Sequence, residues 1–264
     1  MSNASNYCTE YLEDTIGSTD EDVALVMDNI NHVQTSVKFR IPDNGVIMDV
    51  IKGIDLSSEA IQTVMPAYVE RIVLPYNDVA LEFIMKGDLE DVGKDTVMII
   101  LASNMGEGGV YFDLILRTRH MGISRWVDVR TRGVISTDFS VMANLPLGDD
   151  DDITVEESSV LIHAAYILLS FIAALQCSNV EEYDQITDIK LNKSRIKKGK
   201  LSFFDYKILT VNTNKNINKE QSGINNNTSH SNVMNLRKGH INLSESENIW
   251  VNSDVRSKNY RILK

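Results

Sequence analysis

Hydrophobic and polar residues follow a helical period in two short stretches near the start of the chain. Acidic residues at 20–22 precede apolar positions that recur to about residue 32, which predicts an amphipathic helix with an acidic N-cap region. The segment 37–41 alternates apolar with basic residues and ends in a Pro-Asp-Asn-Gly turn, so we predict a short strand there. Ser57 is placed to cap a second short helix that runs to about Val64.

Between residues 71 and 135 the pattern changes to short runs of aliphatic, β-branched and aromatic residues with Gly- and Asp-bearing connections. The runs that we predict as strands are 71–74, 79–85, 96–102, 110–119 and 124–135. The last two are separated by a connection of hairpin length, in which Gly122 can adopt a positive φ. The spacing favours one antiparallel sheet.

A longer uncharged run follows at residues 158–180 and predicts a buried helix over about 155–177. A bilayer span needs about 20 apolar residues, and this run is shorter and contains His163. A membrane span is therefore the weaker reading, and no membrane partner is expected. The predicted fold class is α+β, with a mixed or mainly antiparallel sheet, the long helix on one face and a basic C-terminal β-hairpin appendage.

The composition changes along the chain and suggests four parts. Residues 1–188 form an acidic α+β body, and residues 189–211 read as a basic, strand-like extension. Residues 212–235 are rich in Asn and read as a flexible linker. Residues 236–264 read as a small β appendage around Trp250.

Charge divides the chain more sharply than its net charge of −11 suggests. Residues 1–188 hold 32 acidic and 11 basic side chains, a net of −21, whereas residues 189–264 hold 5 acidic and 15 basic, a net of +10. Such a body repels phosphate. The tail attracts phosphate, an anionic membrane surface, or the body of its own chain.

Cysteine usage and motifs narrow the classes of function. Two cysteines give no disulfide framework, and the first residues lack a secretory signal, so we expect a cytoplasmic protein. Gly106–Gly109 is not followed by the helix that a phosphate-binding loop requires, and the five histidines lack metal-binding spacing. We expect no metal and no other cofactor, and the sequence favours a non-enzymatic protein.

Two features of the predicted sheet are candidates for chemistry. The first is a group of four arginines on the 110–135 hairpin, Arg117, Arg119, Arg130 and Arg132. Their planar donors would hold a phosphate or carboxylate, unless they line a solvated face and pair with Asp113 and Asp128. The second is Glu82 within an apolar strand, where burial would perturb its pKa, although alternation also permits a solvent-facing position.

The basic tail holds the candidate contacts to nucleic acid: Lys193, Arg195, Lys197, Lys198, Lys200, Arg237, Lys238, His240 and Trp250. Cations of this kind contact phosphates, and aromatic rings stack on bases. The alternative is that the 193–200 run is a solvated connector.

The tail also carries a pattern of specific residues. Its elements are Lys190-Leu191-Asn192, Arg195, Gly199-Lys200, Asp205-Tyr206, Arg237-Lys238-Gly239-His240 and Ile249-Trp250-Val251. In these elements the chain resembles a family of uncharacterised proteins of tailed bacteriophages and prophages. The resemblance implies a phage accessory protein made in a bacterial cytoplasm, and it brings no assigned reaction.

Two functional hypotheses follow from the sequence. In the first, a non-enzymatic bacteriophage protein binds nucleic acid through its basic C-terminal region. In the second, the acidic body is a protein-interaction module that engages a host protein, and the basic tail packs on the body to complete the fold.

Overall fold

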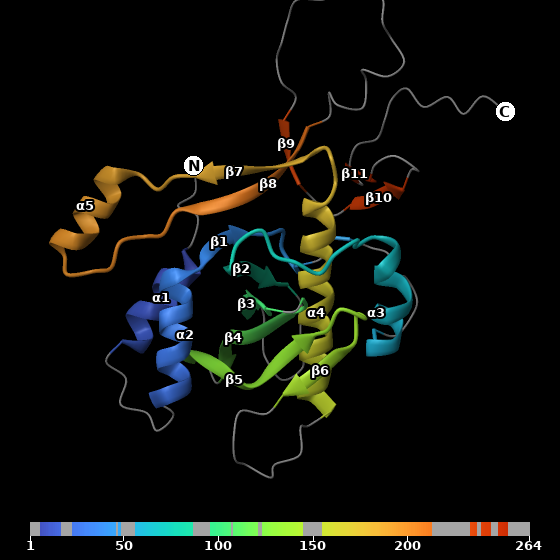
Figure 1. The fold of residues 1–264 in the computed structure, drawn as a ribbon. Helices are drawn as coiled ribbons and strands as arrows, with labels where there is room; N and C mark the ends of the chain where they lie inside the picture. The colour runs from blue at the N-terminus through green and yellow to red at the C-terminus, as the bar shows by residue number, and fades with distance from the viewer. Residues whose placement is uncertain are drawn as a thin grey trace, which may run out of the picture.

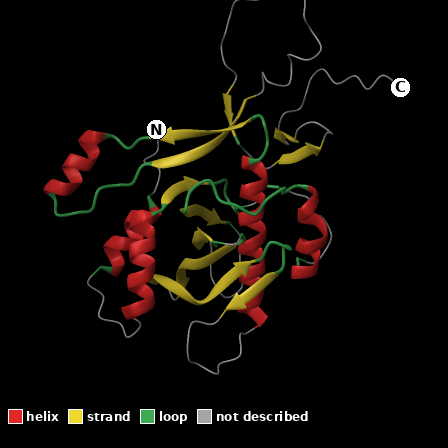
Figure 2. Cartoon of the chain, viewed as in Figure 1, coloured by secondary structure: helices red, strands yellow, loops and turns green. Residues whose placement is uncertain are grey.

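The computed structural model shows an α+β protein in which helices cover both faces of a mixed β-sheet (Figure 1, Figure 2). The structure describes residues 6–16, 23–45, 47–48, 56–86, 96–106, 108–120, 123–144, 155–212, 233–236, 239–243 and 248–252.

The helices are α1 (Tyr7–Thr15), α2 (Val23–Thr35), α3 (Ser58–Val64), the 3-10 turn Met65–Ala67, α4 (Val155–Leu175) and α5 (Ile189–Lys197). The first strands are β1 (Val37–Arg40), β2 (Asp78–Met85), β3 (Thr96–Asn104), β4 (Val110–His120), β5 (Ile123–Ile135) and β6 (Val141–Asn144). The later strands are β7 (Val180–Gln185), β8 (Tyr206–Asn212), β9 (Val233–Asn235), β10 (Gly239–Leu243) and β11 (Asn248–Asn252).

The main sheet has the strand order β6-β5-β4-β3-β2-β1-β8-β7, and β9 also pairs with β8. The pairings are antiparallel except at β1, which lies parallel to β2 on one side and to β8 on the other. A strand from the start of the chain is thus enclosed by strands from its middle and its end. The hairpin β10–β11 forms a separate two-stranded sheet.

Alternation along the strands sends side chains to two cores. Leu81, Ile100 and Leu114 pack with α4 in the larger core, whereas Ala80 and Ile99 pack with α1 and α2 in the smaller one. Because neighbouring residues of a strand point to opposite faces, α4 and the α1–α2 pair must cover opposite sides of the sheet.

Several sequence predictions are confirmed. The run at 155–177 is a buried helix, the strands between 79 and 135 form antiparallel pairs, and Ser57 caps α3 through the Ala60 amide. The sheet is mixed, and a C-terminal hairpin is present. Among the described residues no helix is long and apolar enough to cross a membrane.

Other predictions need correction. Residues 71–74 are not a strand, and the helix α1 was not predicted. The extension 189–211 was predicted to be strand-like, but it begins with the helix α5 and becomes a strand only at Tyr206. That strand, β8, lies inside the main sheet, so the sheet continues beyond residue 188.

The linker predicted at 212–235 is described only at its two ends. Asn212 ends β8, and residues 233–235 form β9, which pairs with β8. Residues 213–232 lie outside the described part of the chain, as do residues 253–264 of the predicted appendage.

Because β8 fills the place beside β1, we expect truncation after Asp188 to remove the cooperative unfolding transition. The lost segment includes four side chains buried in the cores, Tyr206, Leu209, Val211 and Trp250. Loss of one such side chain costs about 2–5 kcal/mol, so several together exceed a typical free energy of unfolding.

Urea denaturation followed by circular dichroism would test this expectation. A truncation after Asn252, which keeps every described residue, is the length control. An unchanged midpoint for the 1–188 chain would contradict the expectation.

Candidate binding arm and its buried anchor

Residues 186–205, here called the α5 arm, connect the neighbouring strands β7 and β8. Figure 1 shows α5 standing away from the sheet beyond the ends of these strands. The arm contains six basic and two acidic side chains, a net charge of +4. It includes all five of the predicted nucleic-acid contacts between residues 193 and 200.

The limits of α5 are set by local chemistry. The Asp188 carboxylate caps the N-terminus by accepting a hydrogen bond from the Lys190 amide at 2.8 Å. At the other end, Gly199 has a φ of +71°, and its amide donates to the Ile196 carbonyl while the Lys200 amide donates to the Arg195 carbonyl. This pair of bonds is the Schellman motif, for which glycine is the favoured residue.

The inner side of α5 holds the returning chain in place. The Asn192 side chain donates to the Phe203 carbonyl at 3.0 Å and accepts from the Phe203 amide at 2.8 Å. The Arg195 guanidinium donates to the Leu201 carbonyl at 2.8 Å and lies 3.7 Å from the centroid of the Phe203 ring. Two side chains of the helix therefore fix the shape of the whole arm.

The arm is also fastened to α1. Arg195 forms an ion pair with Glu13 at 2.7 Å, and the same carboxylate accepts from the Leu201 amide at 2.9 Å. Asn6 donates to the Phe204 carbonyl at 2.9 Å. These contacts hold the arm in one orientation relative to the N-terminal helix.

The outer side of the arm carries unpaired cations and exposed apolar groups. The exposed lysines that make no ion pair with any described residue are Lys190, Lys193, Lys197, Lys198 and Lys200. Ile189 and Ile196 are 67% and 60% exposed, and they lie on one face of α5 together with Lys193. Ile186, just before the helix, is 72% exposed.

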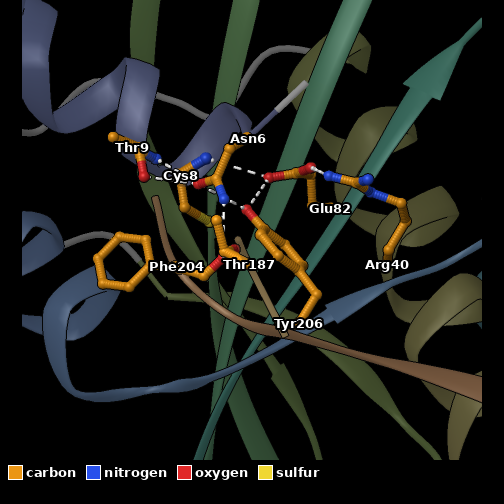
Figure 3. A network of polar contacts seen from close by, with 8 residues as sticks. All are labelled: Asn6, Cys8, Thr9, Arg40, Glu82, Thr187, Phe204 and Tyr206. Carbon is orange, nitrogen blue, oxygen red and sulfur yellow. Dashed lines mark hydrogen bonds and ion pairs between the residues drawn. The ribbon is translucent and has the colours of Figure 1, made fainter. Parts of the chain in front are cut away.

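The return of the arm to the sheet is anchored at Glu82, which lies in the centre of β2 (Figure 3). Its carboxylate is 1% exposed and accepts three hydrogen bonds, each from a different part of the chain. Arg40 of β1 donates at 2.9 Å, the Cys8 amide of α1 donates at 3.1 Å, and the Tyr206 hydroxyl donates from β8. Asn6 adds its Oδ1 as a second acceptor for the Tyr206 hydroxyl, at 3.3 Å.

The solvent-facing position that alternation permitted for Glu82 is therefore wrong, because α1 covers this face of the sheet. Burial raises the pKa of the Glu82 carboxyl, and the Arg40 guanidinium opposes that rise. Burial also raises the pKa values of the Tyr206 hydroxyl and the Cys8 thiol. Cys8 therefore stays a thiol, which is a poor nucleophile.

Lys38 is a second buried charge beside this network. Its ammonium group donates to the Ser36 carbonyl at 2.6 Å and lies 4.0 Å from the centroid of the Phe204 ring. Burial lowers the pKa of Lys38 to about 8. Glu82 and Lys38, with the groups that they contact, connect α1, β1, β2 and β8. We interpret the arrangement as one that holds these elements together.

The predicted arginine site on the hairpin is occupied by the protein itself. Arg117 forms an ion pair with Glu10 of α1, and Arg132 forms one with Asp113 at 2.8 Å. The pair of Arg132 with Asp113 agrees with the structural alternative, and α1 covers the hairpin face instead of solvent. The side chains of Arg119 and Arg130 lie outside the described part of the structure.

Of the other predicted nucleic-acid contacts, the structure describes Trp250 and His240. Trp250 is 1% exposed, its amide donates to Asn179, and its ring is therefore not available to stack on a base. His240 is exposed on β10, and Arg237 and Lys238 lie outside the described residues.

At least two hollows lie in the described surface. One of about 400 Å³ opens where β1 ends beside β8, with Ile41, Ile208 and Leu236 in its wall and Arg40 at its edge. Glu82 does not line it. Within the described ranges, three or more His, Cys, Asp or Glu side chains nowhere gather as they would to hold a metal ion.

Comparison of the chain with models of known protein families, with curated proteins and with solved structures gave no match.

Replacing Glu82 by alanine should lower the free energy of unfolding by about 3–5 kcal/mol, because Arg40 is left partly buried without its carboxylate. The same change should increase amide hydrogen exchange in residues 198–206, because Tyr206 loses the carboxyl group that accepts its hydrogen bond. Glu70→Ala removes an exposed carboxylate and serves as control. A Glu82→Ala variant as stable as this control would contradict the anchoring role.

Lys38 should make stability depend on alkaline pH. In the unfolded chain its pKa is near 10.5, and in the folded protein it is about 8, so the unfolded state binds the proton more tightly. Stability should therefore rise between pH 8 and 10.5, by about 1–3 kcal/mol relative to Lys38→Met. Urea titrations of both proteins across this range would show the difference, and parallel pH profiles would contradict it.

Proposed function

We propose that this protein is a non-enzymatic interaction module that binds an acidic, partly apolar protein surface through the α5 arm. The observation that carries the proposal is the outer side of the arm, where exposed isoleucines lie among lysines that form no ion pair with any described residue. Apolar anchors inside a charged rim are the usual composition of a protein-binding surface.

The geometry of the arm supports a binding role. Asn192, Arg195 and Gly199 fix its shape, and Glu13 fixes its orientation. A surface that is already ordered loses little conformational entropy when a partner binds. The arm therefore presents Ile189 and Ile196 in the geometry in which they would be buried.

The buried network supports the non-enzymatic part of the proposal. Glu82, Cys8 and Tyr206 form a cluster of groups with raised pKa values, and each is less than 5% exposed. Donors and acceptors of the protein already satisfy Glu82 and Tyr206, and neither lines the neighbouring hollow. A catalytic group must reach its substrate, and these groups face only the protein.

Nucleic acid is the second candidate partner, and the unpaired lysines of the arm favour it. The isoleucines favour protein, because phosphates offer them nothing to bury. The arm also lacks an exposed aromatic platform, since Phe203 lies under Arg195 and Phe204 under Lys38. The expected bacteriophage origin and cytoplasmic location stay predictions and fit either partner.

Fluorescence anisotropy would test the proposal with three kinds of probe on the full chain. The first probe is a labelled helical peptide with leucines at every third or fourth position between glutamates, the second is poly-glutamate, and the third is single- or double-stranded DNA or RNA. We expect the amphipathic peptide to bind most tightly, with an affinity that falls as salt rises.

Two arm variants separate the contributions of charge and apolar contact. Lys193→Gln/Lys197→Gln should weaken peptide binding about tenfold. Ile189→Ser/Ile196→Ser should remove the preference for the peptide over poly-glutamate. Ala67→Glu/Ser124→Glu lowers the net charge equally at exposed positions outside the arm and should have little effect. Tight binding of DNA or RNA that depends on the lysines but not on the isoleucines would overturn the proposal in favour of nucleic acid.

A further inference from the structure

The N-terminal helices carry a surface of the opposite character to the arm. Residues 1–36 contain seven Asp and Glu side chains and no Lys or Arg. In the described part of this region, Asp14 of α1 and Asp28 of α2 are exposed. Two apolar side chains, Ile16 and Met27, are each about half exposed close to them in the sequence. Because Glu10 and Glu13 pair with Arg117 and Arg195, the described α1–α2 surface offers two exposed carboxylates and two apolar side chains, a composition that the arm would bind.

The two surfaces do not neutralise each other within one molecule. Arg195 reaches back to Glu13, and this contact belongs to the inner side of the arm. The lysines on the outer side make no ion pair with any described residue of α1 or α2. Within the described part of the chain, each copy therefore presents exposed lysines on the arm and two exposed carboxylates, Asp14 and Asp28, that form no ion pair with one another.

We infer that a second copy of this chain binds the α5 arm, with the arm of each copy lying across α1 and α2 of the other. This inference rests on the proposed function of the arm and names its partner. Charge complementarity and exposed apolar side chains on both surfaces carry it. Lys193 and Lys197 face the neighbourhood of Asp14 and Asp28, and Ile189 and Ile196 meet Ile16 and Met27.

Mutual exchange of arms between two copies gives a closed dimer. When the same two patches meet twice around a two-fold axis, the pair is complete and no patch is left to recruit a third copy. The second contact forms within an existing encounter, so it adds affinity at a high effective concentration. The product is a dimer whose stability falls with salt, since lysines and carboxylates make up its rim.

Sedimentation velocity of the full-length protein between about 20 and about 500 mM salt tests the dimer directly. We expect a dimer at low salt and a shift toward monomer at high salt. Ile189→Ser/Ile196→Ser should weaken the dimer at every salt concentration. A wild-type chain that stays monomeric under all these conditions would overturn the inference.

A charge exchange between two variants makes the test specific. The arm variant Lys193→Glu/Lys197→Glu reverses the charge at two positions of the arm, and the helix variant Asp14→Lys/Asp28→Lys reverses it at two positions of α1 and α2. Each alone should dimerise less than the wild type, because the four exchanged positions then carry charges of the same sign. Mixed in equal amounts they should form a heterodimer, because both contacts are then complementary. Circular dichroism verifies that each variant is folded.

The experiments distinguish failure of the dimer inference from failure of the proposed binding function of the arm. A monomeric wild type that still binds the acidic amphipathic peptide through the arm would overturn the second copy as partner and leave the proposed function standing. A monomeric wild type that does not bind the peptide would overturn both. A mixture of the two variants that stays monomeric, although each is folded, would overturn the exchange of arms.

Discussion

The buried carboxylate of Glu82 is the constraint around which the chain is assembled. An ionised carboxylate inside a protein is costly unless donors replace the water that it loses. Here the donors come from α1, β1 and β8, which are far apart in the sequence. The folded protein can satisfy Glu82 only when all three segments are in place. This requirement joins the N-terminal helix to a strand that follows residue 205.

This joint explains why the basic C-terminal region is not an independent tail. Tyr206 reaches Glu82 at the first residue of β8, and that strand then pairs with β1 and β7. The residues just before it are fastened to α1 through Asn6 and Glu13. The charge split of the sequence therefore does not mark a domain boundary. The basic segment begins in the α5 arm, which connects the neighbouring strands β7 and β8 of the main sheet.

Four residues of the sequence pattern between 190 and 206 have a structural explanation. Asn192, Arg195, Gly199 and Tyr206 each make a contact that shapes or anchors the arm. The side chains of the lysines between them take no part in these contacts. Shape and charge are thus assigned to different residues of one short segment, so a substitution of lysine changes what the arm attracts without changing its form.

The sequence predicted what local patterns determine. The strands between 79 and 135 and the helix over 155–175 follow from periodicity and apolar content. The helix α1 was missed because only a few of its residues are apolar, and with it the cover over Glu82 was missed. The start and stop signals of α5, Asp188 and Gly199, are present in the sequence, but its basic residues suggested an extended connector. The parallel pairing of β1 with β8 joins segments that no local pattern connects.

The candidate binding surface likewise depends on both local sequence and contacts between distant segments. Lysines are visible in any sequence, but whether they are free to bind depends on which carboxylates the fold brings near them. Arg117, Arg132 and Arg195 are neutralised by Glu10, Asp113 and Glu13, respectively. Among the described residues the arm lysines have no such partners, because Asn192 and Arg195 turn the inner side of α5 toward the protein. The surface that we propose to bind a partner is therefore the basic charge that these internal ion pairs leave over.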